Sequence, residues 1–103
     1  MDQKEHLMVV AMEECAEVVK EMSKILRFGP DDYSPFDPAK TPNKTRLVHE
    51  LADLMAVIEM LDPSLCPITM DEDAKAEFRA LMDRKRKKLA TYIEYSRDSG
   101  IVK

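Results

Sequence analysis

Apolar residues recur every three or four positions through three long stretches of this 103-residue chain. That period is typical of one face of an α-helix, and only two glycines interrupt the chain. The first stretch runs from about Gln3 to Phe28 and is expected to stop at Gly29-Pro30. Glycine accepts a left-handed helix cap, and proline cannot continue the hydrogen-bond ladder. Its apolar positions are Leu7, Val10, Ala11, Cys15, Val18, Met22, Ile25 and Leu26.

Two further stretches complete the prediction of an all-α fold. The second helix is expected to open at Pro42 or Asn43 and to end before Asp62-Pro63. The third is expected over about residues 70–96, because Thr69 and Glu72 have the spacing of a capping box. Three long helices with wide apolar faces predict a single domain over residues 1–103. We expect a helical bundle whose core is completed by oligomerisation.

The segment between the first two helices, from Asp31 to Thr41, is rich in proline. It is expected to be an ordered crossover rather than a flexible linker. Its aromatic residues, Tyr33 and Phe36, have two open interpretations: stacking on a nucleobase, or burial against a partner subunit.

Composition narrows the class of protein. The formal net charge of −4 leaves no basic footprint for a nucleic acid. No apolar run approaches the roughly 20 residues that span a bilayer, and the N-terminus lacks a signal-peptide pattern. Cys15 and Cys66 lack paired spacing, so we expect reduced thiols, with Cys15 in the core. The expectation is a cytoplasmic protein that binds neither nucleic acid nor membrane.

Carboxylates lie on helix faces that should be apolar. Glu14, Glu17 and Glu21 align with the apolar stripe of the first helix, and Glu50 and Asp53 flank that of the second. Burying an uncompensated carboxylate costs several kcal/mol, roughly, so such groups are normally paired, protonated or bound to a metal. Oxygen ligands from two helices suit Mg²⁺ or Mn²⁺.

An ordinary solvated helix face explains the same acids. Glutamates three or four positions from Lys20 and Lys24 are common on exposed helices. From spacing alone, the metal site and the solvated face both stay open.

Two acidic motifs carry a family resemblance. Glu13-Glu14-Cys15-Ala16-Glu17, followed by Glu50-Leu51-Ala52-Asp53, resembles the E-E-x-x-E … E-x-x-D signature of the MazG-like all-α nucleoside triphosphate pyrophosphohydrolases. The segment 23–29 (SKILRFG), Asn43, Lys88-Leu89 and Tyr92 are similar to the small, single-domain, often phage-encoded branch. The resemblance covers nearly the whole chain.

The resemblance implies a helical bundle in dimers or tetramers and a Mg²⁺-dependent reaction, with Mn²⁺ as a possible substitute. A metal-activated water would attack the α-phosphorus of a nucleoside triphosphate and release the monophosphate and pyrophosphate, as in control of nucleotide pools. The implied metal ligands are Glu14, Glu17, Glu50 and Asp53. Glu13 and Glu21 are both candidates for the general base, and neither is assigned.

Cations are needed to offset the charge of the leaving phosphates. Lys24 and Arg27 end the first helix, and Lys85 and Lys88 share a face of the third; all four are candidates for the β- and γ-phosphates. Asn43 and Tyr92 join this substrate-binding set through the resemblance. Residues 85–88 also fit an ordinary solvated basic segment, and cations near a helix C-terminus also favour its dipole.

Two other functions compete with this interpretation. Phosphoribosyl-ATP pyrophosphohydrolases share the paired acidic motifs and the type of reaction. A non-catalytic helical interaction protein would keep the acids solvated or in salt bridges across an oligomer interface. Binding of a divalent metal would separate this second alternative from both enzymes.

Overall fold

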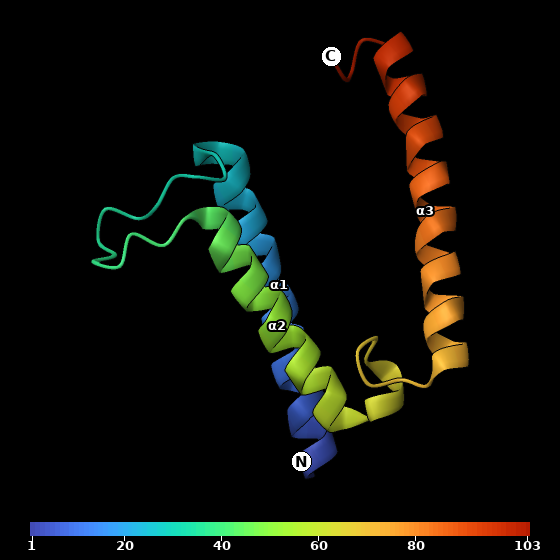
Figure 1. Ribbon diagram of the computed structural model, residues 1–103. Helices are drawn as coiled ribbons and strands as arrows, with labels where there is room; N and C mark the ends of the chain where they lie inside the picture. The colour runs from blue at the N-terminus through green and yellow to red at the C-terminus, as the bar shows by residue number, and fades with distance from the viewer. The chain divides into compact units, whose positions relative to one another are not determined.

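The computed structural model describes all residues from 1 to 103 and contains only helices (Figure 1). The elements in chain order are α1 (Gln3–Phe28), α2 (Asn43–Leu61), the short 3₁₀ helix η1 (Pro63–Leu65) and α3 (Glu72–Asp98). The all-α prediction is confirmed. No helix combines the length and apolar character needed to cross a membrane. Two compact units divide the chain, Met1–Cys66 and Pro67–Lys103, and each is described by itself.

Both ends of α1 follow from local chemistry. Asp2 and Glu5 form a reciprocal capping box, in which each side chain accepts from the backbone N–H of the other residue. At the other end, Gly29 adopts φ 95°, and its N–H donates to the carbonyl of Ile25 at 2.8 Å. The predicted stop at Gly29-Pro30 is confirmed, because glycine has no Cβ to oppose this backbone angle.

Helices α1 and α2 form an antiparallel pair joined by the loop 30–42. The loop supplies acceptors for the first turn of α2, whose N–H groups have no partner within the helix. The carbonyl of Asp32 accepts from the N–H of Asn43 at 2.8 Å, and that of Pro30 accepts from the N–H of Lys44 at 2.9 Å. The loop and the start of α2 therefore form one hydrogen-bonded unit.

Asp37 organises the middle of this loop. Its carboxylate accepts from the backbone N–H groups of Ala39 and Thr41, each at 2.9 Å, and from the guanidinium of Arg46 at 2.6 Å. The hydrogen bond from Thr41 comes first among the causes that lower the pKa of Asp37 to about 2, and Arg46 follows. The segment 31–41 is thus held by its own contacts to α2.

The predicted start of the third helix is wrong by two residues. Helix α3 begins at Glu72 rather than near Met70, and its N-cap is Asp71, which accepts from the N–H of Ala74 at 2.8 Å. Aspartate is a strong N-cap residue, and Glu72 and Asp73 in the first turn favour the positive end of the helix dipole. The Thr69–Glu72 capping box is therefore replaced by a cap on Asp71.

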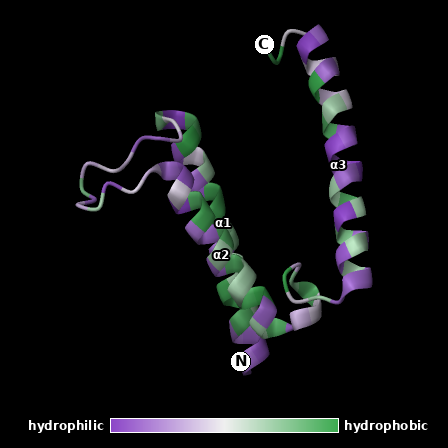
Figure 2. Ribbon diagram, viewed as in Figure 1, coloured by the Kyte–Doolittle hydropathy of each residue, from purple (hydrophilic) through white to green (hydrophobic).

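Few side chains are buried. Among apolar residues only Cys66 is buried, and the two other buried residues are polar, Glu21 and Asn43. Helix α3 has no buried residue. Figure 2 shows hydrophobic colouring over much of α1 and α2 and mixed colouring along α3.

Two neighbouring stripes run along α1. The inner stripe is partly or fully buried and consists of Leu7, Ala11, Glu14, Val18, Glu21 and Ile25. The outer stripe, here called the α1 seam, is exposed and consists of Met8, Met12, Cys15, Val19, Met22 and Leu26. The expectation that Cys15 lies in the core is wrong, because it follows Glu14 of the inner stripe by one residue, about 100° around the helix. Both cysteines are free thiols.

Candidate metal centre and the adjoining loop pocket

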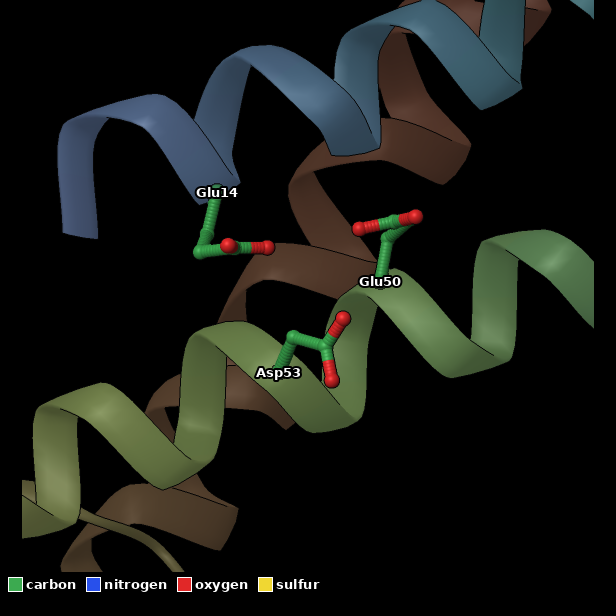
Figure 3. A group of neighbouring side chains, drawn as sticks. All are labelled: Glu14, Glu50 and Asp53. Carbon is green, nitrogen blue, oxygen red and sulfur yellow. The ribbon is translucent and has the colours of Figure 1, made fainter. Parts of the chain in front are cut away.

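Three of the acids singled out in the sequence meet between α1 and α2. Glu14 of α1 faces Glu50 and Asp53 of α2, and one oxygen atom from each of the three carboxylates lies within 4.8 Å of the other two (Figure 3). Glu50 and Asp53 are about one turn apart on α2, so both carboxylates can reach Glu14 of α1. The cluster joins the two sequence motifs at one point.

Glu14 carries the electrostatic cost of this cluster. Its Oε2 atom is buried and has no hydrogen-bond partner. Withdrawal from water raises the pKa of Glu14, and the negative charges of Asp53 and Glu50 raise it further. A proton or a cation at this point would relieve the repulsion.

The other two acids of the first motif lie outside the cluster. Glu17 pairs loosely with Lys20 at 3.9 Å on the helix surface, although its charge still contributes to raising the pKa of Glu14. Glu13 is exposed. The structure therefore assembles Glu14, Glu50 and Asp53 of the four predicted ligands, and the role of Glu17 stays a prediction.

Glu21 lies two turns further along the same inner stripe. It is 3% exposed, and its Oε1 atom accepts from Nζ of Lys24 at 3.1 Å. Its Oε2 atom is buried without a partner. The predicted alignment of Glu21 with the inward face of α1 is confirmed.

A pocket of about 230 Å³, here called the loop pocket, lies where α1 ends, the loop passes and α2 begins. It brings together Lys24, Arg27 and Asn43, three of the residues predicted to bind the substrate. Phe28, Tyr33 and Arg46 also line it. Phe36 is outside it and 92% exposed.

Arg46 is a charged residue of the loop pocket that was not predicted from the sequence. It lines the loop pocket, its guanidinium binds Asp37, and its Nε atom is buried without a partner. A signal existed in the sequence, since Arg46 lies four residues before Glu50 and seven before Asp53, on the same face of α2.

The remaining predicted residues belong to the unit Pro67–Lys103. Lys85 and Lys88 share a surface hollow of about 520 Å³ with Leu81 and Arg84. Nζ of Lys88 lies 5.8 Å from the centroid of the Tyr92 ring, a cation–π contact. Their predicted role toward the substrate phosphates stays a prediction.

Comparison with models of known protein families, with curated proteins and with solved structures finds no match for this chain.

Proposed function

We propose that this protein is a divalent-metal-dependent nucleoside triphosphate pyrophosphohydrolase of the MazG-like kind. It would convert a nucleoside or deoxynucleoside triphosphate and water into the monophosphate and pyrophosphate. The observation that carries the proposal is the meeting of Glu14, Glu50 and Asp53, because these acids come from the two motifs on which the family resemblance rests. A solvated acidic face would not require acids from two helices to converge.

The donor set fits a hard cation. All three side chains offer oxygen atoms, which Mg²⁺ and Mn²⁺ prefer, and the unpartnered Oε2 atom of Glu14 needs a positive partner. Glu17 is the proposed fourth ligand. Its contact with Lys20 is long and exposed, and such pairs contribute about 0–1 kcal/mol, so the contact is easily exchanged for another.

A metal bound by these acids would supply a more acidic water and neutralise charge on the phosphoryl oxygens. The water oxygen forms a bond to the α-phosphorus, the bond from that phosphorus to the bridging oxygen breaks, and pyrophosphate leaves. The water proton passes to a carboxylate of α1 outside the ligand set, with Glu13 and Glu21 as the two candidates.

We also propose that a second copy of the chain covers the α1 seam. The seam residues are spaced alternately by four and three positions, the 3.5-residue period of a helix that packs along another helix. Met12 is 62% exposed, Val19 67% and Leu26 87%, which leaves a continuous apolar line in contact with water. Helix α1 would therefore serve both roles, with Glu14 of the inner stripe at the metal centre and the α1 seam against the second copy.

The decisive experiment is product analysis after incubation with a panel of triphosphates, with Mg²⁺ and then with EDTA. Glu50→Gln and Asp53→Asn are the test variants, and Glu59→Gln, an exposed acid of α2 outside the cluster, is the matched control. Metal-dependent release of monophosphate and pyrophosphate, lost only in the test variants, is the expected result. Turnover of phosphoribosyl-ATP alone would favour the first competing enzyme.

Absence of turnover, together with absence of Mg²⁺ or Mn²⁺ binding by calorimetry, would refute the enzyme. It would leave a helical interaction protein as the remaining function.

A further inference from the structure

We infer that the loop pocket binds the nucleobase of the nucleotide, with the ring of Tyr33 stacking on the base. The inference rests on the proposed function for the position of the phosphates near Glu14, Glu50 and Asp53. It assigns base recognition to the loop 30–42 and to the helix ends that the loop connects.

The walls of the pocket have the chemistry that a base requires. Phe28, Tyr33 and Pro35 provide apolar and aromatic surface, and an aromatic ring can stack on the face of any base. Asn43, which is 4% exposed, uses one amide hydrogen to bind the carbonyl of Gly29 at 3.0 Å. That bond holds the amide still and leaves its oxygen and second hydrogen for the edge of a base.

The volume of the pocket suits one part of a nucleotide. About 230 Å³ is smaller than the roughly 300–1,000 Å³ of sites that enclose a whole drug-sized ligand. The rest of the substrate must therefore lie outside the pocket, along the helices.

Residue order along the helices gives the direction of the substrate. On one face of α2, Asp53 and Glu50 are followed toward the N-terminus by Arg46 and Asn43, in steps of three or four residues. At 1.5 Å per residue, the ten positions from Asp53 to Asn43 span roughly 15 Å. Phosphates held beside the acids would thus lead past Arg46 to the loop pocket.

A similar order occurs along α1. Glu14 is followed toward the C-terminus by Glu21, then Lys24, then Phe28. Both helices therefore present acids first, a cation second, and a pocket residue suited to a base last.

Charge inside the pocket opposes the alternative that it holds the pyrophosphate end. Lys24 is already bound by Glu21, and Arg46 by Asp37. Arg27 lies over the Phe28 ring at 5.0 Å, and Asp32 adds a carboxylate to the lining. Two of the three cations are therefore already paired with acids and are less available to a phosphate. The pocket consequently offers more to a base than to pyrophosphate.

The first test uses steady-state kinetics of the full chain with several triphosphates. Tyr33→Ala should raise KM by about tenfold, since base stacking contributes about 1–3 kcal/mol and 1.4 kcal/mol is a factor of ten. Its kcat should stay near the wild-type value, and Tyr33→Phe should restore KM. Phe36→Ala, in the same loop but outside the pocket, should leave both constants unchanged. An unchanged KM in Tyr33→Ala would overturn the inference while leaving the hydrolysis intact.

The second test does not depend on turnover. Nucleoside monophosphates are added to the protein in EDTA, and saturation transfer from protein to ligand is recorded by NMR. Base and H1′ protons should receive saturation, and Tyr33→Ala should reduce it at least severalfold. If this result were obtained with a protein that hydrolyses no triphosphate, the base-binding inference would stand and only the proposed enzymatic activity would be refuted. Equal saturation in wild type and Tyr33→Ala would overturn the inference. If inorganic pyrophosphate also shifted the Tyr33 and Asn43 amide signals of the wild type, the pocket would be a phosphate site.

Discussion

The side-chain amide of Asn43 donates a hydrogen bond to the carbonyl of Gly29 at 3.0 Å, which joins the start of α2 to the end of α1. Asn43 is one of only two buried polar residues, and Gly29 is the residue whose backbone turns the chain out of α1. This contact therefore joins the two helix ends directly, in addition to the backbone hydrogen bonds from the loop to α2.

Asn43→Ala is expected to lower the free energy of unfolding by about 0.5–1.5 kcal/mol, because the part-buried hydrogen bond to the carbonyl of Gly29 is lost. Urea denaturation followed by circular dichroism measures the change. Lys44→Ala is the matched control: its side chain is 61% exposed, and the surface pair with Asp31 contributes about 0–1 kcal/mol. Equal effects of the two substitutions would contradict the role of the Asn43–Gly29 contact.

Glu14→Gln is expected to stabilise the metal-free protein at pH 7–8. The raised pKa of Glu14 means that its ionised form destabilises the folded state, and this cost appears as pH rises through that pKa. The difference in Tm between variant and wild type should shrink at acidic pH, where Glu14 is protonated. Mg²⁺ should raise the Tm of the wild type but not that of the variant. Glu59→Gln should follow the wild type in both respects, and a Mg²⁺ response retained by Glu14→Gln would count against the metal centre.

Asp37 should make stability dependent on pH in the opposite direction. Its pKa is about 2 in the folded protein against an ordinary value of 3.8, so its contribution is present above about pH 4 and is lost as pH falls toward 2. Asp37→Asn should therefore be less stable than the wild type at pH 7, with most of the difference gone at pH 2. Urea titrations at pH 7, 4 and 2 measure this, with the exposed Asp31→Asn as control. A difference as large at pH 2 as at pH 7 would show that the carboxylate charge is not its cause.

The α1 seam should control the oligomeric state. In the double variant Met12→Glu and Val19→Glu, association would bury two unpaired carboxylates, which should raise the Kd of self-association by about 100-fold or more. Light scattering coupled to size exclusion measures the mass. Val48→Glu, at a 61% exposed position on α2, should keep the wild-type mass. A wild-type chain that is monomeric at all concentrations would refute the second copy as the occupant of the seam.

Features decided by neighbouring residues were predictable from the sequence. The ends of α1 and α2 follow from Gly29-Pro30 and Asp62-Pro63, whose backbone preferences act locally. The start of α3 was misplaced because two capping residues, Thr69 and Asp71, compete within three positions, and spacing alone does not rank them.

Features that depend on contacts distant in sequence were harder to predict. Spacing allowed Glu17 either to join Glu14 or to pair with Lys20, three residues away, and it could not choose between them; the structure shows the pair with Lys20. Arg46 was missed because its partner, Asp37, lies nine residues away in an irregular loop. The convergence of Glu14 with Glu50 and Asp53 required the register that the loop imposes.

The carbonyls of Pro30 and Asp32, which accept from the first turn of α2, bear on how a ligand arrives. Swinging the loop away would break both bonds and leave two N–H groups in the first turn of α2 without these acceptors. We therefore expect the loop to keep its place when a ligand binds. Ligand capture should be an encounter with a surface already in its binding shape, with an association rate that rises linearly with ligand concentration and reaches no plateau set by a prior opening step.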